Sequence, residues 1–205
     1  MKRYVILLWA LCASLAVGAQ NSGEEVLRSM GEKIAAMGPY RVDFTLEMPG
    51  AESGSKGYCV VDGEKFVIAI EDLKQGRNEE LLWTVNGTNR EISLDEPKPH
   101  SRSLFDNPTK AFDFAEELFK VESFDQDDKA VWELILLPNS GVLDGVERIV
   151  LKVGRKTNLP TLLGYDLSGM GLFVRIDKFA PCKLSEGVFN LNAADYEGYE
   201  IIDFR

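Results

Sequence analysis

Two stretches of the sequence decide the fold: GYCVVDGEKFVIAI at residues 57–70 and ELLWTVNGTNREISL at residues 80–94. They contain the dipeptides Asp62-Gly63 and Asn86-Gly87, which tolerate the positive φ angles of a type I′ hairpin turn. The β-branched and aromatic runs beside these turns predict four short strands in an antiparallel meander. Such a sheet has an apolar face that another layer of structure must cover.

The segments around the meander fit the same plan. Residues 71–80 are polar and predict a loop between the two hairpins. Upstream, Ser22 and Glu25 form a capping box, and Gly38-Pro39 ends the helix that follows it. The apolar residues of this helix recur at helical spacing: Val26, Leu27, Met30, Ile34 and Met37. Residues 40–48 then alternate between apolar and polar side chains, so we expect a half-buried strand with the helix packed on the sheet.

A second helix is expected in the middle of this β-rich chain. Asn107 is a suitable helix cap and Pro108 suits the first helical position. The residues that follow are too apolar for a surface helix: Ala111, Phe112, Phe114, Ala115, Leu118 and Phe119. This helix either closes one mouth of a curved sheet as a lid or packs as an ordinary core helix.

The second half of the chain reads as strands. They are expected at residues 131–137, 147–153, 161–167, 172–179 and 200–204, with a hairpin turn at residues 168–171. Strands at about ten-residue spacing with turn residues between them are typical of a barrel or a strongly curved antiparallel sheet. We therefore predict a mainly β (α+β) protein.

Residues 1–19 predict a cleaved secretory signal peptide. Lys2 and Arg3 precede an apolar run over residues 4–17, and Val17 and Ala19 supply small residues at the cleavage site. Residues 20–205 then form one domain. The net charge of −10 repels nucleic acid, so we expect no nucleic-acid partner.

Cys59 and Cys182 are the cysteines that follow the signal peptide. In an oxidising compartment they could form a disulfide, or they could remain two separate thiols. The sequence leaves both alternatives open.

The sequence shows no recognisable catalytic or metal-binding motif. Its one histidine, His100, lies in a proline-flanked loop, and there is no G-x-S-x-G, Walker or dinucleotide-binding motif. Residues 125–128 (DQDD) begin like a calcium loop, but Lys129 and Ala130 break the pattern. We therefore predict a protein that is not an enzyme and has neither a metal nor a cofactor. Its apolar interior could line a ligand cavity or be filled by its own side chains.

Several short motifs follow one another in a characteristic order. The first helix is followed by the strand at residues 42–48, and then by Gly63-Glu64-Lys65-Phe66, a turn with an aromatic residue. Residues 83–88 (WTVNGT) are similar to a W-x-x-[DN]-G-x-T pattern, a helix starts at Asn107, and residues 187–203 form a closing segment. In this order the chain resembles the LolA family of periplasmic carriers of outer-membrane lipoproteins, especially its Bacteroidetes-type members.

The resemblance implies a curved, incomplete antiparallel β-barrel with an N-terminal helix and an inserted lid helix. Its apolar concavity would hold the acyl chains of lipoproteins. Strand alternation selects the expected lining, where a one-residue error would reverse every assignment: Phe44, Leu46, Phe66, Ile68, Trp83, Trp132 and Leu134. The lid would use Phe112, Phe114 and Leu118.

The resemblance also implies a function. We expect a monomeric carrier in the periplasm that shuttles lipoprotein acyl chains from the inner to the outer membrane. Its partners would be an inner-membrane release machinery and an outer-membrane acceptor. The alternative is a sensor or scaffold protein on the same fold, which does not transport lipid and binds a protein partner.

Overall fold

The computed structural model describes residues 22–98, 101, 118–140 and 143–205. One α-helix, α1, spans Gly23–Ala35. The strands are β1 (Tyr40–Glu47), β2 (Ser55–Asp62), β3 (Lys65–Ile70), β4 (Leu73–Arg77), β5 (Leu82–Asn86), β6 (Glu91–Asp95), β7 (Phe119–Asp125), β8 (Val131–Pro138), β9 (Arg148–Gly154), β10 (Pro160–Leu167), β11 (Met170–Pro181) and β12 (Glu200–Asp203). Among these described residues, no helix is both long and apolar enough to cross a membrane.

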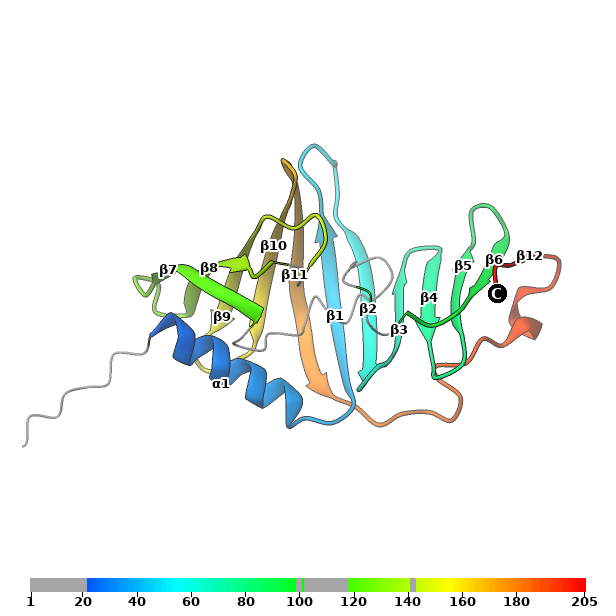
Figure 1. Ribbon diagram of the computed structural model, residues 1–205, viewed down its shortest axis with the longest axis horizontal. Coiled ribbons are helices and arrows are strands. Elements are labelled where there is room, and N and C mark those ends of the chain that lie inside the picture. Colours follow the sequence, from blue (N-terminus) through cyan, green and yellow to red (C-terminus); the bar gives the residue numbers. More distant parts are fainter. Residues whose placement is uncertain (1–21, 99–100, 102–117, 141–142) are drawn as a thin grey trace, which may run out of the picture.

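The strands form one curved sheet in the order β12-β6-β5-β4-β3-β2-β1-β11-β10-β9-β8-β7 (Figure 1). Neighbours run antiparallel, except for β12, which runs parallel to β6. The outer strands β12 and β7 lie at opposite ends of this order, so the sheet does not close. The predicted mainly β fold with an incomplete barrel is confirmed.

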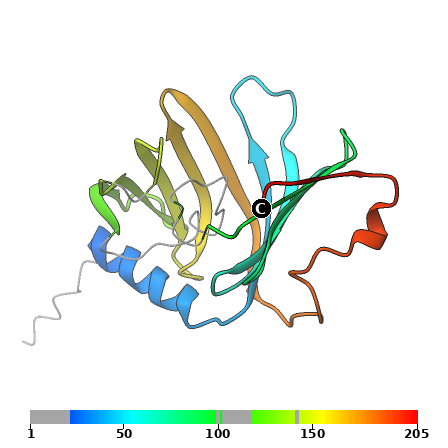
Figure 2. The same ribbon diagram turned by 45° about the vertical axis from the view of Figure 1, so that its right-hand side comes forward.

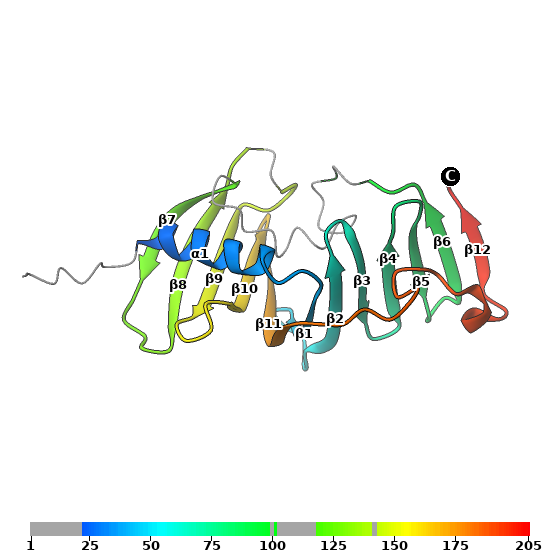
Figure 3. The ribbon, with the colours of Figure 1, turned by 90° about the horizontal axis from the view of Figure 1, so that it is seen from below.

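Helix α1 covers part of one face of the sheet. The Ser22 hydroxyl accepts a hydrogen bond from the Glu25 N–H at 3.1 Å, which confirms the predicted cap. Four residues of the predicted apolar stripe are buried against strand residues: Val26, Leu27, Met30 and Ile34. Met37 lies beyond the end of α1 and is only partly buried. We call the face that α1 covers the helix-side face and the opposite face the tail-side face. Figure 3 shows α1 lying across the half of the sheet that contains β7–β11.

The predicted meander is confirmed, but its turns differ from the expectation. The β2–β3 turn is centred on Gly63-Glu64, one residue later than predicted, with Gly63 at φ +58°. The loop between β5 and β6 spans residues 87–90 instead of a two-residue turn. There the Asn86 side chain accepts a hydrogen bond from the Asn89 N–H at 3.1 Å, so asparagine favours this loop through its side chain.

Two strands were not predicted. The expected polar loop at residues 71–80 contains β4, which pairs with both β3 and β5 although four of its five residues are not apolar. Phe119, expected in the second helix, instead begins β7. Leu118 is described, but the residues of that expected helix before it, including Phe112 and Phe114, lie outside the described residues.

The segment after β11 covers part of the tail-side face. It leaves the middle of the sheet, contains a short 3-10 helix η3 (Ala193–Tyr196) and joins the edge as β12 (Figure 2). We call residues 182–199 the tail. The Trp83 indole N–H donates a hydrogen bond to the Phe189 carbonyl at 3.1 Å, and both residues are buried. The tail-side cluster contains Val60, Val67, Trp83, Val85, Ile92 and Phe189.

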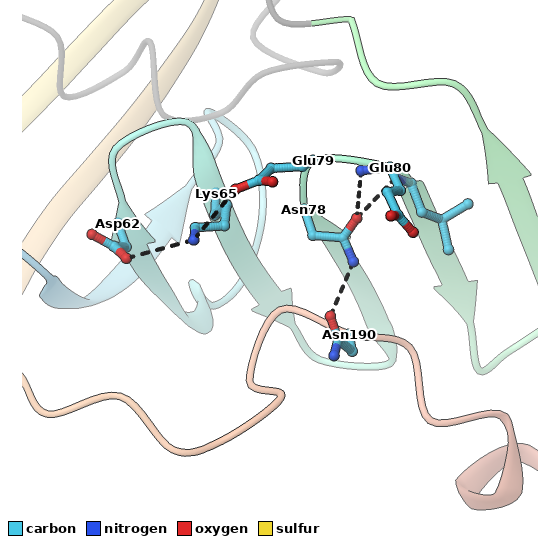
Figure 4. Close-up of polar contacts among 7 residues, drawn as sticks. Asp62, Lys65, Asn78, Glu79, Glu80 and Asn190 are labelled. Atoms are coloured by element: carbon cyan, nitrogen blue, oxygen red, sulfur yellow. Dashed lines mark hydrogen bonds and ion pairs between the residues drawn. The ribbon is translucent and has the colours of Figure 1, made fainter.

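Asn78 joins the tail to the β4–β5 turn (Figure 4). Its side-chain oxygen accepts hydrogen bonds from the backbone N–H groups of Glu80 and Leu81, both at 2.9 Å. Its side-chain nitrogen donates to the Asn190 side-chain oxygen at 3.0 Å. One amide therefore stabilises the turn and holds the tail against it.

The contact between Gly76 and Trp83 provides a test of this packing. A Cβ atom at Gly76 would lie 2.2 Å from the Trp83 ring, so Gly76→Ala should displace the indole and destabilise the fold by about 1–3 kcal/mol. Thermal unfolding followed by circular dichroism measures this effect. The matched control is Gly171→Ala, whose Cβ would make only ordinary contacts of 3.4 Å or more. Equal melting temperatures for the two variants would contradict the packing described.

Candidate functional site

Six of the seven expected lining residues lie together on the helix-side face. Phe44, Phe66 and Leu134 are at most 3% exposed and belong to the core cluster that includes α1. The other three are partly buried and pack against that cluster: Leu46, Ile68 and Trp132. The expected lid residue Leu118 also packs against it. That these residues bind lipid remains a prediction.

Trp83 lies elsewhere. On β5 it directly follows Leu82, and on β4 it pairs with Gly76, which lies between Gln75 and Arg77. Leu82 belongs to the helix-side cluster, so its neighbour Trp83 points to the tail-side face and packs there with the tail. The sequence pattern placed Trp83 on the inner, cavity-lining face, because nothing in the sequence indicated a second apolar face with a cover of its own. The predicted place of Trp83 on the lining is therefore corrected: it packs on the tail-side face.

The helix-side face is not buried evenly. Its deeply buried residues on β1–β3, such as Val42, Cys59 and Phe66, give way to half-buried ones toward the β1–β2 loop and the β10–β11 hairpin. These two connections project beyond their neighbours at the top of Figure 1. The half-buried residues, which we call the apolar rim, are Leu46, Ile68, Ile70, Leu167 and Leu172.

Exposed methionines extend the apolar rim into solvent. Met48 follows β1 and is 51% exposed, and Met170 at the β10–β11 hairpin is 63% exposed. Methionine is flexible and adapts to irregular apolar partners. The apolar interior therefore reaches the surface at this end of the sheet. Sequence alternation identified Leu46 and Ile68, and the same alternation extended by one step would have found Ile70.

The interior beneath the apolar rim strongly disfavours charge. Burial raises the pKa of the Cys59 thiol to about 12. Burial also raises the pKa of the Tyr165 hydroxyl. Both side chains belong to the helix-side cluster and stay neutral at physiological pH. An interior of this kind accepts a hydrocarbon chain far more readily than a charged group.

The helix-side face becomes polar over β4–β6. Most positions that continue the helix-side face carry half-buried polar side chains, which we call the polar half: Gln75, Thr84, Asn86, Glu91, Ser93 and Asp95. Gln75 donates a side-chain hydrogen bond to Thr84 at 3.4 Å. The same face is thus apolar over β1–β3 and mainly polar over β4–β6, where Leu73 and Leu82 are the apolar exceptions, a division that suits a molecule with an apolar and a polar part.

Arg77 lies at the border between these two parts. It is 2% exposed and pairs across the strands with Phe66 and Leu82. Its Nη2 forms an ion pair with the Glu64 carboxylate, and its guanidinium carbon lies 5.9 Å from the centre of the Phe66 ring. Its Nη1 is buried and has no hydrogen-bond partner among the described residues. Sequence reasoning missed Arg77 because residues 71–80 were expected to form a loop.

The structure describes only some of the other residues considered for metal binding, catalysis or disulfide formation. In the described ranges, no group of three or more His, Cys, Asp or Glu side chains is placed to hold a metal ion. His100 lies outside these ranges. Cys59 and Cys182 are both free thiols, one in the helix-side cluster and the other packed against the tail-side cluster. Because the sheet lies between them, the disulfide alternative is not realised.

Neither a protein-family model nor a curated protein matches the sequence. Solved structures with a similar fold exist. An uncharacterized conserved protein from Thermus thermophilus is 11% identical, with a TM-score of 0.56 over 89% of this chain and 99% of that one. At this identity the likeness concerns the fold alone.

Two further solved structures have lower TM-scores. A LolA superfamily protein from Nitrosomonas europaea is 10% identical, with a TM-score of 0.39 over 80% of this chain and 96% of that one. The MucA/MucB complex from Pseudomonas aeruginosa contains a chain that is 11% identical, with a TM-score of 0.44 over 80% of this chain and 62% of that one.

Thiol labelling tests the burial of the helix-side interior. With a pKa near 12, about one in ten thousand Cys59 thiols is ionised at pH 8, and the side chain is fully buried. Cys59 should therefore resist iodoacetamide in the native protein and react after unfolding in guanidinium chloride, as peptide mass mapping would show. The half-buried Cys182 serves as the internal control. Rapid native labelling of Cys59 would mean that the interior opens readily.

Proposed function

We propose that the protein binds the acyl chain of a lipid or lipoprotein on its helix-side face, with the apolar rim as the point of entry. The observation that carries this proposal is the continuity between the rim and the buried interior. Leu46 and Ile68 are half-buried at the rim and pack against the helix-side cluster. Each methylene buried there would contribute about 0.8 kcal/mol, so a long chain could bind through shape-tolerant contacts.

The dimensions of α1 support this proposal. A helix of 13 residues is about 20 Å long, and strands lie about 4.8 Å apart, so α1 can span about four strands. The apolar part of the helix-side face extends from β7 through β1 to β3. This face is therefore wider than α1 alone can cover, and at its apolar rim, where Leu46, Ile68 and Ile70 are only half-buried, an acyl chain is a suitable further cover.

The likeness of the motifs to the LolA family suggests the wider role. In this proposal the protein is a non-enzymatic, monomeric, Bacteroidetes-type carrier in the periplasm, delivered there by its signal peptide. It would take lipoprotein acyl chains from an inner-membrane release machinery and pass them to an outer-membrane acceptor. The exposed Met48 and Met170 beside the rim would contact these apolar partners during transfer.

One observation favours the alternative, a sensor or scaffold that binds a protein. Phe44, Phe66 and Leu134 are almost completely buried, as they would be in an interior filled by its own side chains. In that case the exposed apolar residues on and beside the edge strand β12, Ile201 (56%) and Phe204 (65%), are where a partner strand could add to the sheet.

Lipid retention by rim variants tests the proposal. Protein purified from a bacterial periplasm should carry acyl chains, detectable by native mass spectrometry and by solvent extraction. Ile68→Asn should lower the retained lipid about tenfold or more, because it places a polar amide where the chain contacts the rim.

The matched control is Leu94→Asn. Leu94 is also a half-buried strand residue, but it packs against the tail-side cluster. This variant should retain lipid like the wild-type protein, and circular dichroism would show that both variants fold. A wild-type protein that carries no acyl chain and takes up none from lipid suspensions would sink the carrier proposal and favour the protein-binding alternative.

A further inference from the structure

A buried hydrogen-bond donor, the guanidinium of Arg77, lies at the border between the apolar and polar parts of the helix-side face. Arg77 is 2% exposed, and its guanidinium is a charged group with several N–H donors. A buried charged donor without a partner costs free energy, so an unsatisfied one calls for a partner such as a ligand, an ion or a water molecule. The Nη1 of Arg77 is such a donor among the described residues.

The charge of Arg77 is already compensated. Its Nη2 pairs with Glu64, whose side chain is 65% exposed. The other cation beside this turn, Lys65, is held by the carboxylates of Asp62 and Glu79 at 4.0 and 3.9 Å, as Figure 4 shows. A second anion at Nη1 would leave an excess negative charge in a buried place. A neutral oxygen acceptor would satisfy Nη1 without adding charge.

From these observations we infer that Nη1 of Arg77 binds the carbonyl oxygen of a neutral acyl ester or amide, at the junction between the acyl chain and the head of the ligand. The inference rests on the proposed lipid-binding function and specifies its ligand class. The acyl chain lies over β1–β3, beside Phe66, and the head group lies over the polar half, beside Gln75 and Thr84. Because Nη1 is enclosed in this structure, nearby side chains shift when the ligand enters.

The ligand that fits this arrangement is defined by its chemistry. It has a hydrocarbon chain, a carbonyl at the first carbon of that chain and an uncharged polar group beyond it. Acyl glycerols and the ester- and amide-linked acyl groups of lipoproteins share these features. Free fatty acids differ because they carry a carboxylate, and alkyl ethers differ because they lack the carbonyl.

A matched pair of lipids tests the inference in the wild-type protein. 1-Dodecanoylglycerol and 1-O-dodecylglycerol have the same head and chain, but only the first has a carbonyl. Isothermal titration calorimetry below their critical micelle concentrations should show about tenfold or greater preference for the ester, as expected for a hydrogen bond to a charged donor. Equal affinity for the two lipids would overturn the inference. Binding of neither lipid would reject the proposed function itself.

Two variants assign the preference to Arg77. Arg77→Met keeps a flexible, unbranched side chain and removes its donors, so the ester should bind no more tightly than the ether, and ether affinity should be unchanged. If Arg77→Met does not fold, Arg77→Leu, which also lacks a donor, replaces it. An ester preference that survives in the folded variant would contradict the inference.

Glu64→Gln tests the charge argument. The side chain is largely exposed, so the fold should tolerate the change. In the wild-type protein dodecanoate should bind less tightly than the ester. With the guanidinium no longer compensated, dodecanoate affinity should rise by about tenfold relative to the ester. Tighter binding of dodecanoate than of the ester by the wild-type protein would show that the acceptor is an anion, against the inference.

Discussion

Successive side chains of a strand point to opposite faces of a sheet, and this constraint shapes the whole protein. The sheet carries a buried apolar cluster on each face, one containing Phe66 and the other containing Val67, its neighbour on β3. Each cluster needs its own cover. Helix α1 covers part of one face, and the tail covers the other, where the Trp83 indole is hydrogen-bonded to the carbonyl of Phe189.

The change of apolar face along the sheet follows from this arrangement. On β5, Leu82 and Thr84 continue the helix-side face, while Trp83 and Val85 point to the tail. The tail therefore supplies the core for this end of the sheet, so its helix-side surface is free to be polar. An amphipathic binding face needs such a division, because one face cannot be apolar enough for a lipid chain and polar enough for its head at the same positions.

Much of the fold could be predicted from the sequence. Short-range signals located α1 and most strands, because the Ser22 cap and the alternation in β1 depend on local periodicity. Strand β4 was not predicted, because Lys74, Gln75 and Arg77 form no apolar pattern and the strand depends on pairing with its two neighbours. Such a strand is defined by its hydrogen-bonded partners, which are not visible in its own residues.

The candidate site was predictable to a smaller extent. Strand alternation correctly grouped Phe44, Phe66 and Leu134, because alternation alone sets the face once one residue is placed. It failed for Trp83, whose face is set by a tail about a hundred residues later in the chain (the separation is 106 residues from Trp83 to Phe189). Arg77 could not have been found, because its burial and its partner Glu64 arise from the pairing of β3 with β4.

The central strand β1 has a consequence for how the chain folds. It pairs with β2, which follows it directly, and with β11, so that Thr45 on β1 meets Asp177 across 132 residues of sequence. Closing so long a loop costs conformational entropy before the pairing of β1 with β11 stabilises the chain. Assembly of the two half-sheets should therefore be slow. Until β11 pairs with β1, Val42 and Phe44 lie on an unpaired strand edge. A newly made chain is then prone to pair with other unfinished chains, and a holding chaperone would protect it.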